Sequence, residues 1–164
     1  MIDDTLCASA GEAFFVREAA RKQAEGLTLD ELVEWALHHR LEVCHWFTVD
    51  TLDHLRHGGR ISTAAAAIGN MLSIKPLLHV DDAGRLQLVK KPRGRKMAMR
   101  EQLDRFHEGW NPERGNTILV AHGDNPQAAE TLAESIHREC PEAEIVYGKS
   151  GPSSERIRDR ECWL

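Results

Sequence analysis

Apolar residues along the chain fall into blocks with helical spacing and blocks with strand spacing. The first block runs from Ala8 to Glu25 and predicts a helix with Phe14, Phe15 and Ala19 facing inward. Gly26 follows directly and is typical of the residue that ends a helix.

A second helix is predicted from Thr28. Thr28 and Glu31 have the spacing of a capping box, in which each side chain binds the other residue's backbone N–H. The expected apolar stripe of this helix consists of Leu29, Leu32, Val33, Ala36 and Leu37.

The remaining pattern mixes strands and helices. Asp50 has the position of an N-cap for the short helix, and the stretch 81–84 has turn composition. Strands are expected at 42–49, 73–80, 85–91, 116–122 and 142–147, and helices at 50–55, 63–71, 95–107 and 126–140. This order predicts an α/β or mixed α+β fold, with two layers and a mixed sheet flanked by helices.

Composition narrows the class of protein. The chain has 164 residues, of which 41% are hydrophobic and 29% are charged, as in a globular protein of about one domain. No apolar run approaches the ~20 residues of a membrane span, and no secretory signal is recognised. The four cysteines are far apart, so we expect a cytoplasmic protein without a metal site or cofactor.

Charge is uneven along the chain. The segment 85–105 holds eight basic and two acidic residues, a net charge of +6. Because the whole chain carries −5, the rest carries −11. An acidic remainder repels nucleic acid, so a single carboxylate or phosphate group is the better partner for the basic segment.

The stretch from Gly58 to Ser62 is the first candidate anion site. Gly58 and Gly59 permit a sharp turn, Arg60 supplies a guanidinium group, and Ser62 has the position of a helix N-cap. The alternative is that these glycines and Ser62 only cap helices. A second basic turn surrounds Arg93, for which a solvated charged turn is the alternative.

The run of residues 47–62, Phe-Thr-Val-Asp-Thr-Leu-Asp-His-Leu-Arg-His-Gly-Gly-Arg-Ile-Ser, resembles the signature of the DegV family. The runs 68–78, 82–85 and 91–96 continue the resemblance, which covers about residues 1–147.

The resemblance implies that the protein binds a long-chain fatty acid and presents its carboxylate to a bacterial fatty acid kinase. It would then be a non-catalytic lipid carrier, touching membranes only indirectly. Arg60 and Arg93 match family arginines associated with the ligand's head-group end and with docking of the kinase.

The resemblance also implies a truncated chain. Residues 1–40 resemble the end of a first α/β domain, 41–164 resemble the second domain, and the tail 149–164 diverges. The family's carboxylate-binding segments precede residue 1, and its closing His-Thr-Gly-Pro-Gly motif has only an echo at 149–153. Because an exposed apolar wall favours association, we expect a homo-oligomer.

Two alternatives stay open. The chain is either an inactive remnant, or a small phosphate-handling enzyme in which His122 acts with Arg60.

Overall fold

The computed structural model describes residues 4–62, 73–149 and 162–163. The helix expected at 63–71 and most of the divergent tail lie outside these residues. The helices are α1 (Ala10–Ala24), α2 (Leu29–His39), α3 (Asp53–His57), α5 (Arg95–Gly109) and α6 (Pro126–Glu139). The strands are β1 (Trp46–Thr48), β2 (Leu77–Val80), β3 (Leu86–Lys90), β4 (Thr117–His122), β5 (Glu144–Lys149) and β6 (Cys162–Trp163).

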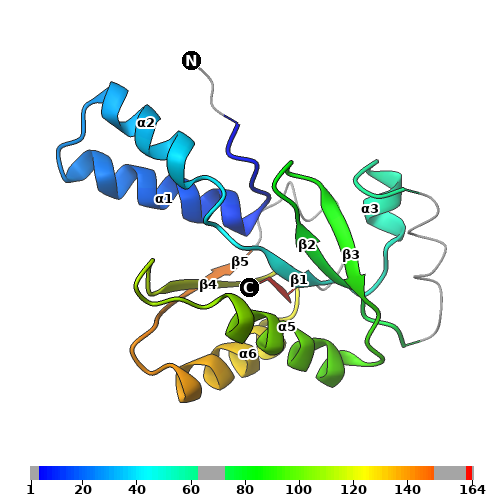
Figure 1. Ribbon diagram of the computed structural model, residues 1–164. Coiled ribbons are helices and arrows are strands. Elements are labelled where there is room, and N and C mark those ends of the chain that lie inside the picture. The colour runs from blue at the N-terminus through cyan, green and yellow to red at the C-terminus, as the bar shows by residue number, and fades with distance from the viewer. Residues whose placement is uncertain (1–3, 63–72, 150–161, 164) are drawn as a thin grey trace.

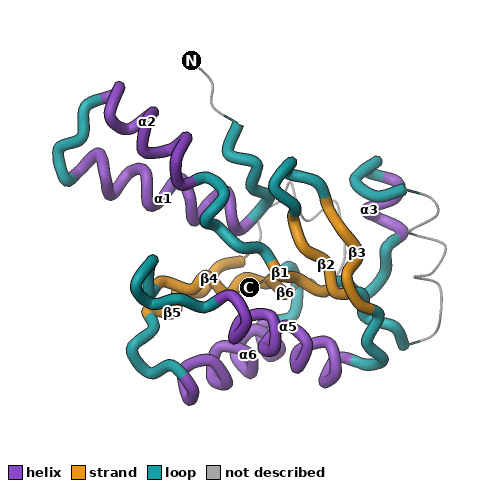
Figure 2. The backbone as a smooth tube through the Cα atoms, in the orientation of Figure 1, coloured by secondary structure: helices purple, strands orange, loops and turns teal. Residues whose placement is uncertain are grey.

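The strands form one mixed sheet in the order β3-β2-β1-β6-β4-β5. β4 and β5 are parallel and are joined through α6, whereas the other neighbouring strands are antiparallel. The strands expected at 73–80 and 85–91, with the turn between them, are confirmed as the antiparallel hairpin of β2 and β3, although β2 begins only at Leu77. The mixed sheet flanked by helices is likewise confirmed (Figures 1 and 2).

Helices cover the two faces of the sheet unequally. α5 and α6 pack beneath it, as Figure 1 shows, and join β4 in one apolar core. The largest side chains in that core are Phe106, Leu132 and Ile136. A second core around Phe47 and Leu78 packs under α3 on the opposite face.

Helix caps follow the sequence pattern. The Glu31 backbone N–H donates to Thr28 Oγ1 at 3.4 Å, and the Thr28 backbone N–H donates to Glu31 Oε2 at 2.8 Å, which completes the capping box. Asn125 caps α6 by accepting from the Ala128 N–H at 3.1 Å. These local signals predict the starts of α2 and α6 correctly.

Three local predictions are wrong. Asp50 does not cap α3, because its carboxylate accepts from Lys75 and Arg95 instead, and α3 begins only at Asp53. The strand expected at 42–49 shortens to Trp46–Thr48, because the preceding residues bridge from α2 to the sheet. Leu29 and Leu37 are 75% and 44% exposed, because α2 packs against α1 and buries none of its residues completely.

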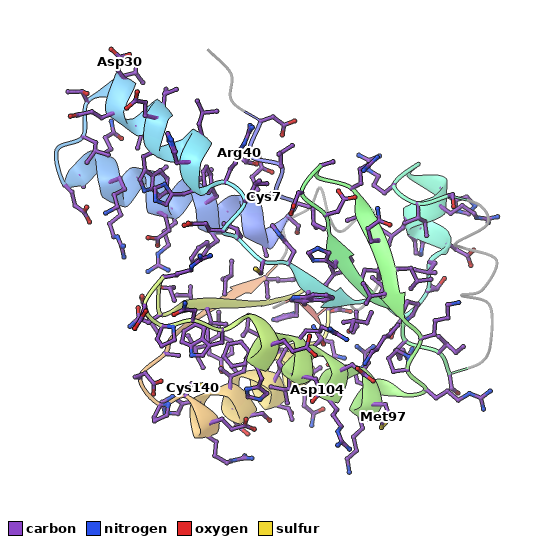
Figure 3. All side chains as sticks on the ribbon, in the orientation of Figure 1. Cys7, Asp30, Arg40, Met97, Asp104 and Cys140 are labelled. Carbon is purple, nitrogen blue, oxygen red and sulfur yellow. The ribbon has the colours of Figure 1, made fainter. Side chains whose placement is uncertain are left out.

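The α1–α2 pair forms a helical hairpin that is attached to the sheet at its base and side. Near the base, the Cys7 thiol lies 4.0 Å from the Arg40 carbonyl oxygen, and Figure 3 shows these two residues side by side. Arg17 on α1 pairs with Glu144 on β5 at 2.9 Å. The first contact closes the base of the hairpin, and the second holds its side against the sheet.

The tightest of these attachments joins Gly11 to His45. His45 is 4% exposed, and its Nε2 accepts from the Ala8 N–H at 3.5 Å. A Cβ atom on Gly11 would lie 1.7 Å from that same Nε2. Only glycine therefore lets the first turn of α1 approach the imidazole this closely.

We predict that Gly11→Ala lowers stability although alanine favours a helix. The added methyl group overlaps the His45 ring, which should cost about 1–3 kcal/mol of unfolding free energy. Chemical denaturation measures the change. Gly109→Ala is the matched control, because Gly109 also lies in a helix but has open space around it, so this variant should match or exceed wild type. Equal stability of the two variants would contradict the contact.

We also predict a pH dependence that originates at His45. Burial lowers the His45 pKa to about 4, and nearby His79 lowers it further, against a raising hydrogen bond with the Val43 backbone. The unfolded chain therefore binds a proton more readily below pH ~6.5, so the stability falls as the pH falls. The loss between pH 7.5 and pH 5 should be about 2 kcal/mol. His45→Gln should flatten this slope, whereas His57→Gln, at an exposed histidine, should keep it.

Candidate functional site

A cavity of about 970 Å³ lies between the α1–α2 hairpin and the sheet. One wall comes from α1, α2 and the segment 41–46, and the other comes from the end of α5, the following loop and the first half of β4. Its aromatic lining consists of Phe14, Phe15, Trp35, Trp46, Phe106 and Trp110. This volume is within the range of small-molecule binding sites, whose walls are mostly apolar.

Aromatic packing fixes both walls of the cavity. On the hairpin side, the rings of Phe15 and Trp35 stack with centroids 5.4 Å apart. On the sheet side, Phe106 and Trp110 pack at 5.2 Å. The Arg105 guanidinium carbon lies 5.6 Å from the centroid of the Trp46 ring. The apolar surface of the cavity is thus made from side chains that already support one another.

Glu144 links the two walls at the β5 side. Its carboxylate accepts from Thr117 Oγ1 at 2.8 Å and from Arg17 at 2.9 Å. These two hydrogen bonds hold the Glu144 pKa below its usual range. Because Arg17 and Glu144 are both exposed, this link is weaker than the contact at His45.

The Gly58–Ser62 turn lies elsewhere, after α3. Gly59 has φ +71°, in the left-handed region that favours glycine, and the Gly58 N–H closes the helix on the His54 carbonyl at 2.8 Å. The Arg60 side chain is exposed and donates to the Gly58 carbonyl. Ser62 is also exposed. Gly58 therefore caps the end of α3, as the alternative interpretation expects, while the side chain of Arg60 remains exposed to solvent.

Arg93 is exposed in the second basic turn, where its backbone pairs with that of Ile74 in an isolated antiparallel β-bridge. Backbone hydrogen bonds hold this turn from Lys75 N to Pro92 O at 2.9 Å and from Gly94 N to Ser73 O at 2.7 Å. Asp50 follows β1 and accepts from Lys75 Nζ at 2.7 Å and from Arg95. Asp50 therefore connects the end of β1 to Lys75 and Arg95, which both adjoin the Arg93 turn.

Strand register places the Arg93 turn, which follows β3, at one end of the sheet, whereas the Gly58–Ser62 turn follows α3 and belongs to no strand. Thr48 pairs with Leu77, and Leu77 pairs with Lys90, so the end of β1, the start of β2 and the end of β3 coincide. His122 belongs to the same end, because both it and Thr48 pair with Cys162. The guanidinium groups of Arg60 and Arg93 share no hydrogen bond or ion pair within the described part of the chain.

The cavity lies toward the other end of the sheet. Its β4 residues are Thr117, Ile118 and Leu119, the first three of that strand. None of the five residues chosen from the sequence, Gly58, Gly59, Arg60, Ser62 and Arg93, lines it. One feature of the sequence could have indicated the cavity. Three of the four tryptophans line it: Trp35 lies in α2, Trp46 begins β1 and Trp110 directly follows α5.

His122 is half-buried at the end of β4. Its Nδ1 is buried and has no hydrogen-bond partner among the described residues. No contact joins it to Arg60 in the residues that the structure describes. For the enzyme alternative, the structure therefore shows an unpaired ring nitrogen on His122, but it does not show His122 and Arg60 paired in one site.

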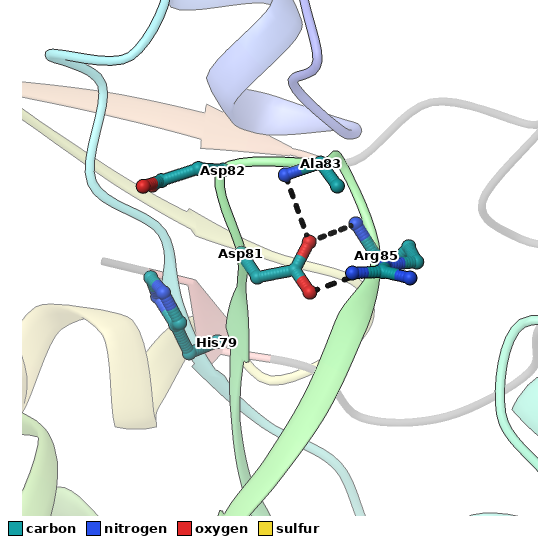
Figure 4. A pocket seen from close by; sticks show the side chains of 5 residues that line it. All are labelled: His79, Asp81, Asp82, Ala83 and Arg85. Atoms are coloured by element: carbon teal, nitrogen blue, oxygen red, sulfur yellow. Dashed lines mark hydrogen bonds and ion pairs between the residues drawn. The ribbon is translucent and has the colours of Figure 1, made fainter.

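A second hollow, of about 480 Å³, lies beside the turn between β2 and β3 (Figure 4). Asp81 fills its polar side by accepting from the backbone N–H groups of Ala83 and Arg85 and from the Gln87 amide at 2.8 Å. The Arg85 N–H and the Gln87 amide are the main reasons why the Asp81 pKa falls to about 2. This carboxylate is saturated by its own turn, so we assign it a structural role.

The described residues contain neither a metal-binding cluster nor a membrane-spanning helix. Over residues 4–62 and 73–149, no group of three His, Cys, Asp or Glu side chains is placed to hold a metal ion. Over the same residues, no helix combines the length and the apolar character needed to cross a membrane.

Similar sequences come from several bacteria. A DegV domain-containing protein of Clostridium perfringens is 42% identical over 150 residues, which are 92% of this chain and 52% of that protein. One from Streptococcus pyogenes is 36% identical over 154 residues, again 92% and 52%. The chain thus spans about half the length of these relatives.

Similar folds occur in proteins solved with bound lipids. The fatty acid kinase (Fak) B3 protein of Streptococcus pneumoniae, loaded with linoleic acid, matches with a TM-score of 0.91 at 21% identity over 99% of this chain and 58% of that chain. A fatty-acid-binding DegV family protein from Thermus thermophilus matches with a TM-score of 0.80 at 26% identity, over 99% and 59%. The likeness to the Streptococcus pneumoniae protein shows that the two chains share a fold.

The sequence of residues 1–154 matches the model of an uncharacterised family, DegV. Together with the 42% identical relative and the shared fold, this match shows that the chain belongs to the DegV family.

Proposed function

We propose that this protein binds a long-chain fatty acid, whose acyl chain occupies the cavity beneath the α1–α2 hairpin. The observation that carries the proposal is the cavity itself, with its volume of about 970 Å³ and its aromatic lining. Burying an acyl chain there removes apolar surface from water, at about 25 cal/mol per Å². The fatty-acid-binding relative from Thermus thermophilus supports the same ligand class.

The proposal includes presentation of the ligand to a fatty acid kinase. Arg60 and Arg93 do not line the cavity, so we assign them to docking of that partner rather than to the ligand. Both are exposed on turns, and Arg93 lies within the basic segment 85–105, directly after β3. The match to the Streptococcus pneumoniae fatty acid kinase B3 protein supports such a partner.

In this proposal the protein is a cytoplasmic carrier without catalytic residues or a cofactor other than its lipid. Self-association is part of it, because Leu29 at 75% and Leu37 at 44% exposure leave apolar surface on α2 for a second copy to cover.

Native mass spectrometry followed by organic extraction tests lipid binding. We expect the purified protein to carry about one fatty acid per chain. Phe14→Asp should lose the lipid, because it puts a charge on the cavity wall. Val89→Asp is the matched control, because Val89 is 40% exposed and lies outside the cavity, and it should stay loaded. A wild-type protein that arrives empty and fails to take up added oleate would support the inactive remnant instead.

Substitution of the basic turns tests the docking role. With a fatty acid kinase catalytic subunit and ATP, Arg60→Ala and Arg93→Ala should each slow acyl phosphate formation about tenfold, a loss of ~1.4 kcal/mol. Fatty acid loading should not change. Arg100→Ala, at an exposed arginine on α5, should behave as wild type. Unchanged phosphorylation in both turn variants would refute the assignment.

A further inference from the structure

The short strand β6 pairs with only part of its neighbour β4. Its two residues, Cys162 and Trp163, lie opposite His122 and Ala121, the last two residues of β4. Among the described residues, no strand pairs with residues 117–119 on that side of β4. The first half of β4 is therefore an open edge in the interior of the sheet.

The hydrogen bonds to β5 identify the backbone groups that this edge leaves open. The Glu144 N–H donates to the Asn116 carbonyl at 2.8 Å, so the Asn116 carbonyl points toward β5. Successive residues of a strand point their backbone groups to opposite sides, so Ile118 also faces β5, whereas Thr117 and Leu119 face the β6 side. Neither Thr117 nor Leu119 has a backbone hydrogen bond on that side to any residue in 4–62, 73–149 or 162–163.

The cavity beneath the hairpin continues the line of β6. Its walls include the segment 43–46, which leads into β1, and residues 117–119 of β4. Because β6 lies between β1 and β4, those two strands are about 9.6 Å apart, twice the spacing of paired strands. The part of the cavity between 43–45 and 117–119 is therefore a slot in line with β6, with unpaired backbone groups along its β4 side.

Apolar side chains lie on both faces of this slot. Ile118 belongs to the core that β4 forms with α5 and α6, and Phe106 and Trp110 line the cavity there. Leu119 alternates to the other face of the sheet, where Phe15 of α1 lines the cavity. A strand that is covered on both faces is apolar at successive positions. The slot therefore favours an apolar strand segment.

We propose that the slot binds an extended apolar segment of another polypeptide, which adds to β4 as an antiparallel strand in line with β6. The proposal goes beyond the proposed function and does not depend on it, since the peptide lies in the plane of the sheet and the acyl chain lies between that plane and the hairpin. Buried backbone N–H and C=O groups need hydrogen-bond partners. A peptide supplies both at the spacing of β4, whereas an acyl chain supplies neither, and open strand edges bind peptides in this way.

Amide hydrogen exchange followed by NMR tests this on the whole chain. The probe is the peptide acetyl-Lys-Val-Ile-Val-Lys-amide. In the free protein the Thr117 and Leu119 amides should exchange quickly, while the Ile118 amide, which faces β5, should exchange slowly. At saturation the peptide should slow exchange at Thr117 and Leu119 at least tenfold and leave Ile118 unchanged.

Two comparisons isolate the backbone hydrogen bonds. The fully N-methylated peptide keeps the side chains but has no amide donor, so it should bind at least tenfold more weakly. Leu119→Pro removes the N–H that faces the slot without removing a bond to β5, and should bind the peptide about tenfold more weakly than Leu119→Ala, which keeps that N–H. Equal binding by the two variants, or by the two peptides, would overturn the proposal.

The remaining outcomes identify other occupants of the slot. Slow exchange of Thr117 and Leu119 in the free protein at every concentration would show that the edge is already paired, which overturns the proposal. Slow exchange that appears only as the protein concentration rises would assign the slot to a second copy and overturn it too. If oleate protects both amides as well as the peptide does, the slot does not select a polypeptide. If oleate does not bind at all, only the proposed function fails.

Discussion

The approach of Gly11 to the buried imidazole of His45 determines where the α1–α2 hairpin sits. A Cβ atom at position 11 would overlap His45 Nε2, so the hairpin meets the sheet at this point only because residue 11 is glycine. The other attachment, the ion pair of Arg17 with Glu144, is more exposed. The cavity under the hairpin is therefore a consequence of one close backbone contact, with aromatic rings filling both of its walls.

The two ends of the sheet have different chemistry. The first half of β4 borders the cavity, whereas Asp50, His122 and the Arg93 turn lie at the opposite end. The six residues of β4 rise ~3.3 Å each, which separates the two ends by about 17 Å.

Local signals in the sequence predicted the elements well and the cavity not at all. Thr28 with Glu31 and Asn125 with Pro126 mark helix starts by short-range hydrogen bonds, which depend on neighbours in sequence. Asp50 has the same local signature, but Lys75 and Arg95, distant in sequence, take its carboxylate. The motif around Arg60 identified the family, whereas the tryptophans of the cavity wall come together only through tertiary packing, which no spacing rule describes.

A crystal structure of the protein with oleate tests the central claim most directly. We expect an acyl chain between α1 and the first half of β4, in contact with Trp35 and Trp110. Oleate bound instead at the end of the sheet beside Asp50 and the basic turns, with the space beneath the hairpin empty of lipid, would contradict it.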